Sequence, residues 1–440
     1  MSKIPICKSL INDCLAQMRI ENPSKATIRD IFILSDLIQK QSGVEFVRME
    51  LGVPGLPASE IGIEAEIEAL HSGVASVYGM VDGIEPLKQE TARFAKLFMD
   101  VDVSPRSCIP TVGSMQGTYA AMLTASRMVN GKDTILFIDP GFPVQKQQVA
   151  VMGGKLKSFD IKNNRGEKLR NILEEYLSEG NICAILYSNP NNPTWVCLTD
   201  EELQILGDVA NRHQVILLED LAYFAMDFRQ NLGKPGKVPF QPTVAKYTNN
   251  WIQFLSSSKI FSYAGQRIGM MIMSDHIYNM ECALFKETFN SPTFGSTITQ
   301  RVLYALSSGT SHSAQYAMAA MLKAANDGTY QFVDQVKIYG EKANAMKKIF
   351  TNNGFHIIYD KDGDQDIADG FYFTVGYGKM TGAELLSELL HYGVSAITLN
   401  NTGSHEQGLR ACTSFAKSEL FPALNERLAL FNQHHSKNKN

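Results

Sequence analysis

A lysine surrounded by hydroxyl residues is the first group in this sequence that could do covalent chemistry. In FLSSSKIFSYAGQRIGMM, residues 254–271, a strand-like run leads into serines, then Lys259, a glycine-bearing loop and Arg267. Desolvation and a nearby cation make a lysine amine nucleophilic, and the serine hydroxyls and the arginine fork suit a phosphate. A lone loop lysine is usually a solvated surface residue, but these neighbours weaken that interpretation.

A carboxylate at the end of an apolar run is the second candidate. In VILLEDLAYF, residues 215–224, four apolar residues lead into Glu219 and Asp220. Ligands of open parallel sheets bind beyond the carboxyl ends of the strands, and a carboxylate there is costly to bury unless a cation pairs with it. Asp220 could instead cap a turn or meet an arginine, and Tyr223, three residues later, is ambiguous alone.

Two further segments could orient a ligand. The prolines of NPNNPT, residues 189–194, fix a rigid turn in which an asparagine amide can face a ligand oxygen. GSMQG, residues 113–117, opens a helical pattern, and a helix N-terminus behind small residues binds anions. An ordinary glycine turn capped by Ser114 is an equally good interpretation of that segment.

These candidates need a sheet that brings them together. Short apolar runs that predict strands occur at residues 134–139, 182–187, 215–220, 251–256 and 268–273. Helical patterns separate most of them, such as 199–213, which begins with the cap candidate Thr199. Near-continuous apolar strands alternating with helices predict an α/β fold with a mostly parallel sheet covered on both faces.

The pattern changes after about residue 310. A long helical pattern covers 313–352, and strand-like and helical segments follow at 354–360, 369–377, 383–393 and 409–415. We therefore expect a large α/β domain over residues 60–310. Residues 1–59 and 311–440 are expected to form a smaller α+β domain that closes over the active site.

Composition excludes several classes of protein. The 440 residues carry 41 Lys plus Arg and 45 Asp plus Glu, a formal charge of −4, so neither nucleic acid nor an anionic membrane is expected as a partner. The seven cysteines are scattered, which favours reduced thiols in a cytoplasmic protein. No signal segment, membrane-length apolar run, phosphate-loop motif, GxGxxG, HExxH or GxSxG is present, and no metal site is expected.

Taken in order, the candidate segments resemble the class I/II aminotransferases, fold-type-I pyridoxal-phosphate enzymes, over roughly residues 50–415. SSSKIFSYAGQRIG resembles that family's SxSKxFxxxGxRxG segment, NPNNPT its NPxNPTG segment and DLAY its DxxY segment. The resemblance implies a large domain with a mostly parallel seven-stranded sheet between helices, a smaller α+β domain, and pyridoxal 5'-phosphate as cofactor.

The resemblance also implies a role for each matching residue. Lys259 would form the Schiff base and shuttle the proton, Asp220 would pair with the pyridine nitrogen, and Asn192 and Tyr223 would hydrogen-bond the phenolic oxygen. The phosphate would be held by Ser114, the Met115 amide, Ser256 and Arg267.

Other implied contacts lie nearer the substrate and the subunit boundary. Phe142, in DPGFPVQKQ, would stack on the cofactor ring, and Tyr78 would reach the phosphate of the neighbouring subunit, which implies a homodimer. Arg410, in GLRACTSF, would grip the substrate α-carboxylate. Asn192 and Val53, the latter in a segment similar to GxPDxP, would also contact the substrate.

The sequence departs from the family pattern at three points. Trp195 replaces the glycine that ends NPTG, and Gly55 and Leu56 stand where the family has an acidic residue. Both changes could reshape the substrate pocket. Phe142 lacks a hydroxyl, so it can stack but cannot donate a hydrogen bond.

The resemblance predicts an aminotransferase that moves an amino group from an L-amino acid to a 2-oxo acid through a Lys259 Schiff base, in ping-pong half-reactions. A β-lyase, or other α-carbanion chemistry such as decarboxylation, stays open because the same groups serve those reactions. A regulatory protein that senses pyridoxal phosphate is a third alternative, but the sequence shows no basic helix-turn-helix pattern before the predicted large domain.

Overall fold

The computed structural model describes residues 4–436 and divides into two compact units. The larger unit consists of Leu56–Asn191 and Cys197–Val336. The smaller unit consists of the described residues up to Gly55, Asn192–Val196, and those from Lys337 onward. The domain boundaries predicted from the sequence, and the predicted closure, stay predictions.

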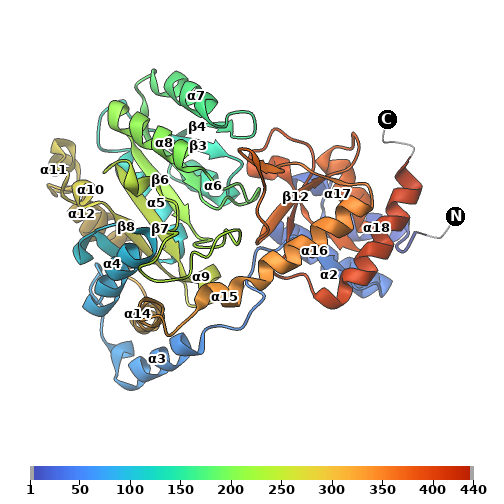
Figure 1. Ribbon diagram of the computed structural model, residues 1–440, viewed down its shortest axis with the longest axis horizontal. Helices are drawn as coiled ribbons and strands as arrows, with labels where there is room; N and C mark the ends of the chain where they lie inside the picture. Colours follow the sequence, from blue (N-terminus) through green and yellow to red (C-terminus); the bar gives the residue numbers. More distant parts are fainter. Residues whose placement is uncertain (1–3, 437–440) are drawn as a thin grey trace. The chain divides into compact units, whose positions relative to one another are not determined.

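A sheet that includes β3, β4, β6, β7 and β8 forms the centre of the larger unit (Figure 1). It has seven strands in the order β2-β8-β7-β6-β5-β3-β4. Strands β3 to β7 run parallel, whereas β8 is antiparallel to both β2 and β7. The mostly parallel seven-stranded sheet is therefore confirmed. The bounds are β2 Cys108–Val112, β3 Thr134–Asp139, β4 Lys155–Asp160, β5 Ile182–Ser188, β6 Ile216–Leu221, β7 Trp251–Ser256 and β8 Ile268–Met273.

Helices cover this sheet. Helix α5 contacts β2 and β5 to β8, α8 contacts β6, and α4 and α14 contact β2 and β8 respectively. Helix α8 begins where the sequence predicts: the Thr199 hydroxyl accepts the Glu202 amide at 3.2 Å, and Glu202 accepts the Thr199 amide at 3.0 Å. The bounds are α3 Glu60–His71, α4 Glu85–Met99, α5 Gly113–Ala125, α6 Pro143–Val151, α7 Glu167–Leu177, α8 Asp200–His213 and α14 His312–Asn326.

Strand alternation decides which side chains meet α5. Leu218 of β6 and Ile252 and Phe254 of β7 lie in the apolar cluster that α5 also enters. Since successive side chains of a strand point to opposite faces, Asp220 and Ser256 project from that same face, at the carboxyl ends of their strands.

The helical pattern over 313–352 does form helices, but the prediction of one long helix is wrong because the chain forms three there. Helix α14 ends at Asn326, α15 spans Phe332–Val336 and α16 spans Ile338–Asn352. Gly328 adopts φ +72°, a left-handed conformation that ends a helix and that glycine takes without strain.

The smaller unit is α+β. Its antiparallel sheet has the order β14-β15-β12-β9, and a parallel pair joins β1 to β13. The strands are β1 Val47–Arg48, β9 His356–Ile357, β12 Tyr372–Gly376, β13 Val394–Ser395, β14 Ile397–Thr398 and β15 Leu409–Cys412, beside a short β10–β11 hairpin, Lys361–Asp362 and Gln365–Asp366. The main helices are α1 Lys8–Met18, α2 Ile28–Ser42, α16, α17 Gly382–Leu390 and α18 Phe421–His435.

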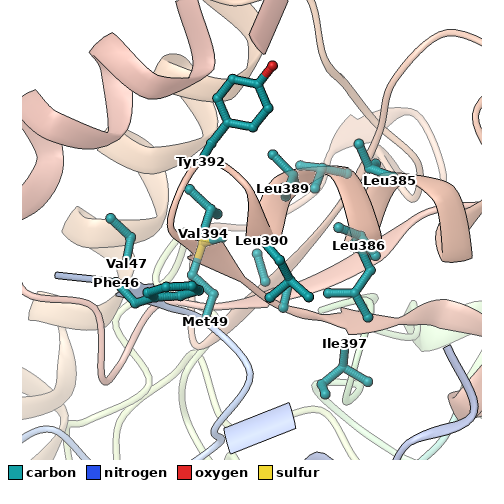
Figure 2. Packing of buried hydrophobic residues seen from close by; sticks show 14 of the residues in the cluster. Phe46, Val47, Met49, Leu385, Leu386, Leu389, Leu390, Tyr392, Val394 and Ile397 are labelled. Carbon is teal, nitrogen blue, oxygen red and sulfur yellow. The ribbon is translucent and has the colours of Figure 1, made fainter. Parts of the chain in front are cut away.

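Helix α17 supplies much of the apolar core of this unit. Its leucines recur at three- and four-residue spacing and so form one stripe. Figure 2 shows this stripe close to residues of the β1 and β13 segments. The residues of the core labelled there are Phe46, Val47, Met49, Leu385, Leu386, Leu389, Leu390, Tyr392, Val394 and Ile397.

Among residues 4–436, no helix combines the length and apolar character that a membrane span requires.

Leu386→Ala should lower the free energy of unfolding by about 2–5 kcal/mol, because Leu386 is 1 % exposed and its removal leaves a cavity. Urea denaturation measures this loss. Ser387→Ala on the same helix is the control and should change stability by about 0.5 kcal/mol or less. A Leu386→Ala loss as small as that of the control would contradict the described core.

Candidate active site

The N-terminus of helix α5 is built to receive an anion. The helix begins directly after β2, and no side chain caps its first amides. The helix dipole and these amides favour a negative charge at that end. Gln116 instead accepts the amide of Val112, one residue before the helix, at 2.8 Å. Ser114, at the second helical position, is half-buried, and Met115 is partly exposed.

Two glycines let a cation and strand β8 approach this helix end. A Cβ at Gly113 would lie 2.6 Å from an Arg267 guanidinium nitrogen, and a Cβ at Gly269 would lie 3.0 Å from the Ser114 amide nitrogen. Backbone atoms leave no space for a side chain at Gly269, whereas at Gly113 a side chain would require Arg267 to move and would have to adopt φ +65°. Arg267 itself is exposed, has φ +52°, and donates to the Ala264 carbonyl at 2.8 Å. The exposed guanidinium beside the helix end can therefore bind a phosphate.

Lys259 lies on the short helix α9, Ser257–Ile260, immediately after β7. The Ser256 hydroxyl caps this helix by accepting the Ser258 amide at 3.2 Å. The Ser257 hydroxyl donates to the Ile268 carbonyl at 2.7 Å and joins the turn to β8. Lys259 is half-buried. Its side chain extends from a backbone that these hydrogen bonds fix at the carboxyl edge of the sheet.

Asp220 is a buried carboxylate without a cation. It is 6 % exposed, accepts from the Gln145 side chain at 2.8 Å and from the Ala222 amide at 3.1 Å, and forms no ion pair within residues 4–436. Burial raises the pKa of Asp220 to about 6, against the smaller opposing effect of those two donors. A positively charged ligand group would remove this penalty.

The neighbouring carboxylate, Glu219, shows what a satisfied buried acid looks like. It projects from the opposite face of β6 and accepts from Tyr187 at 3.1 Å, Thr243 at 2.5 Å and Gln253 at 3.0 Å. Burial raises the pKa of Glu219, and these donors oppose the increase. Glu219 therefore has a structural environment, whereas Asp220 has capacity left for a ligand.

Sequence reasoning missed Gln145. It lies on α6, is 3 % exposed, and donates to Asp220. It lies three residues after Phe142, in the first turn of a helix, and no motif in the sequence distinguishes it from other helical glutamines. Phe142 is the residue before α6 and is half-buried.

The two predicted tyrosines lie in different surroundings. Tyr223, after β6, is 4 % exposed, whereas Tyr78 is 93 % exposed. Residues 4–436 cover only a small part of Tyr78, and its predicted role at a subunit boundary stays a prediction.

The smaller unit contains a buried cation without a carboxylate. Arg410 of β15 is 1 % exposed, donates to the Glu50 carbonyl, and lies with its guanidinium 4.9 Å from the centre of the Tyr372 ring. Its Nε is buried without a hydrogen-bond partner in the described chain, and no carboxylate there pairs with it. An unpaired buried guanidinium is costly, so this site fits a carboxylate ligand.

Asn192 and Val53 are the other residues of the smaller unit that were predicted to contact a ligand. Asn192 is 6 % exposed, and the Asn192–Pro193 bond is cis. Val53 is 38 % exposed, and its carbonyl accepts from the Ser414 hydroxyl at 2.5 Å. Trp195 is fully buried with φ +66°, a conformation that costs a residue with a Cβ about 1–3 kcal/mol.

The larger unit thus brings together an amine, an anion site and a carboxylate that lacks a cation. These groups fit a ligand that carries an aldehyde, a phosphate and a ring nitrogen able to hold a proton, as pyridoxal phosphate does. Between Ile4 and Ser436, no group of three or more His, Cys, Asp or Glu residues is placed to hold a metal ion.

Comparisons with known proteins agree with this chemistry. The family described as Aminotransferase class I and II matches residues 52–422. An LL-diaminopimelate aminotransferase of Natranaerobius thermophilus is 24 % identical over 74 % of this chain and 78 % of its own length. A probable aspartate aminotransferase of Methanocaldococcus jannaschii is 24 % identical over 76 % and 80 %.

Solved structures have the same fold. An aspartate aminotransferase double mutant from Thermus thermophilus gives a TM-score of 0.73 at 18 % identity and covers 94 % of this chain and 98 % of its own. An alanine aminotransferase from Pyrococcus furiosus gives 0.74 at 18 % identity with the same coverage. The expected fold-type-I architecture is confirmed.

Asp220 should make the cofactor-free protein less stable as the pH rises. With a folded-state pKa of about 6 against an ordinary 3.8, the folded state binds more protons than the unfolded state between these values, so stability falls across that window. The difference between the two pKa values, at about 1.36 kcal/mol for each unit, lowers the free energy of unfolding by about 3 kcal/mol.

Urea denaturation of cofactor-free protein from pH 4 to pH 8 measures this effect. Asp220→Asn should lack the decline and be more stable than the wild type above pH 6. The exposed Asp334→Asn is the control and should keep the wild-type pH dependence. An Asp220→Asn protein with the wild-type pH profile would refute the buried, uncompensated carboxylate.

Proposed function

The chain belongs to the class I and II aminotransferase family, and from that premise we propose that Lys259 and Asp220 carry out the transfer of an amino group from an L-amino acid to a 2-oxo acid. The family uses pyridoxal phosphate, which when bound supplies an aldehyde for amines and a ring that accepts the electron pair of the substrate α-carbon.

The environment of Asp220 is the main support for this proposal. Its carboxylate is buried, accepts from two donors and has no cation beside it among residues 4–436. A protonated ring nitrogen would supply that cation, and the carboxylate would in turn keep the nitrogen protonated. Gln145 holds the carboxylate in place and so fixes its direction.

Lys259 is proposed to carry the cofactor and then to move the proton at the substrate α-carbon. Its position on a capped, four-residue helix after β7 limits the reach of the amine to the carboxyl edge of the sheet. Asn192 and Tyr223 are proposed to donate to the phenolic oxygen and Phe142 to stack on the ring. The phosphate is proposed to bind at Ser114, the Met115 amide, Ser256 and Arg267.

Arg410 is proposed to bind the substrate α-carboxylate, next to Val53 and Asn192. A carboxylate would pair with the guanidinium and accept from the Nε, which has no partner in the part of the chain that the structure describes. Every relative reported above is named an aminotransferase, and no feature of the site favours a β-lyase or a regulatory role. Aspartate, LL-diaminopimelate and alanine, the amino acids in those names, are the first donors to test.

Lys259→Ala should lower transamination by at least about 100-fold, because the residue is assigned both cofactor attachment and proton transfer. The wild type should show a visible absorbance band that shifts when an amino donor is added. Borohydride reduction and peptide mass spectrometry should place the cofactor on Lys259. Lys286→Ala, an exposed lysine of the same unit, is the control; retained turnover in Lys259→Ala, or label on another lysine, would refute the assignment.

A homodimer is proposed on a separate observation. Large apolar side chains are exposed in the loop before α4 and in a second segment that follows β8. The two segments lie side by side: the Val77 carbonyl is 3.1 Å from the His312 ring, and a Cβ at Gly309 would lie 3.6 Å from the Val81 Cα. A second copy would cover such a patch. Its residues are Val77, 59 % exposed, Tyr78, 93 %, Met80, 71 %, Tyr304, 58 %, and Leu306, 44 %.

Met80→Asp should convert the dimer into a monomer, because a buried unpaired carboxylate at the interface is costly. Light scattering on wild type and variant measures the mass, against 48.8 kDa for one chain. Tyr78→Phe should stay dimeric but bind the cofactor about tenfold more weakly, since it loses one hydrogen bond to an ionised group. A monomeric wild type would contradict the proposed dimer.

A further inference from the structure

Trp195 occupies a backbone conformation that favours glycine. Its φ of +66° lies in the left-handed region, where a Cβ crowds the backbone. The NPTG motif that this segment resembles has glycine at the position of Trp195. The indole is nevertheless completely buried. The surrounding structure must therefore hold the side chain in a defined place.

Gly370, just before β12, and Tyr372, the first residue of β12, hold the indole in that position. A Cβ at Gly370 would overlap the six-membered ring of the indole, so the glycine leaves the space that Trp195 fills. Tyr372, two residues later, meets the indole edge-on, with ring centres 6.3 Å apart and planes at 60°. Trp195, which stands where the family motif has glycine, thus packs against Gly370 on the neighbouring segment.

Tyr372 connects the indole to the buried arginine. The Arg410 guanidinium lies 4.9 Å from the centre of the Tyr372 ring, within the range of a cation–π contact. Tyr372 pairs in register with Cys412, and Thr374 pairs with Arg410. The Tyr372 and Arg410 side chains therefore project from the same antiparallel pair of strands. The contacts run without a gap from Trp195 through Tyr372 to Arg410.

We propose that Trp195 is a positioning residue for substrate binding: it fixes the Tyr372 ring, and the ring fixes the plane in which Arg410 presents its guanidinium to the substrate α-carboxylate. This inference rests on the proposed function of Arg410. Because that contact exists both before and during the reaction, its loss weakens binding uniformly. KM therefore rises while kcat stays nearly constant.

Trp195→Gly should raise KM for the amino donor by about tenfold and change kcat by less than about twofold. Trp195→Phe, which keeps an aromatic ring, should show a smaller increase. Added indole should lower KM of Trp195→Gly toward the wild-type value by filling the vacated space, and should leave the wild type unchanged.

A double-mutant cycle tests the complementarity of Trp195 and Gly370. Gly370→Ala should raise KM, because its methyl group displaces the indole, whereas adding Gly370→Ala to Trp195→Gly should raise KM no further. Leu386→Ala is the control for general destabilisation of the smaller unit and should leave KM unchanged. Additive effects, or an equal KM increase in Leu386→Ala, would overturn the proposal.

The role of Arg410 is tested separately. Arg410→Lys should weaken both donor binding and the affinity of the holoenzyme for maleate, an unreactive dicarboxylate, measured by calorimetry. If Arg410→Lys has no effect, the proposed function of Arg410 fails. If Arg410→Lys weakens binding while Trp195→Phe and Gly370→Ala keep wild-type KM, and indole has no effect on Trp195→Gly, only the Trp195 inference fails.

Discussion

A carboxylate removed from water without a cation is the constraint on which the site in the larger unit depends. Asp220 is held at the carboxyl end of β6 by one side chain and one amide, neither of which carries charge. Next to it, Glu219 is also buried but has several donors. The protein can therefore satisfy a buried acid, and leaves Asp220 to a cationic ligand group.

Arg410 shows the same constraint with the opposite charge. It is 1 % exposed, and no carboxylate of the described chain pairs with it. Asp220 in the larger unit and Arg410 in the smaller unit are thus both buried without an oppositely charged partner among the described residues. A cofactor with a protonated ring nitrogen and a substrate with a carboxylate are complementary to these two charges, which is why the aminotransferase chemistry of the family fits this chain.

The sequence allowed much of the larger unit to be predicted, because strand ends and motifs coincide there. Lys259, Asp220 and Arg267 follow or precede apolar runs, and a parallel sheet brings such ends to one edge. Gln145 and Tyr372 could not be found this way, because a glutamine or tyrosine within a regular element resembles any other. The break between α14 and α15 depends on one left-handed glycine, Gly328, within a helical pattern. The direction of the Trp195 indole depends on Gly370, which is distant in sequence.

The protonation state of the cofactor ring nitrogen tests the central claim most directly. Protein loaded with pyridoxal phosphate labelled with ¹⁵N in the ring can be studied by NMR at neutral pH. The account predicts the chemical shift of a protonated nitrogen in the wild type and that of an unprotonated nitrogen in Asp220→Asn. An unprotonated nitrogen in the wild type, or the same shift in both proteins, would contradict it.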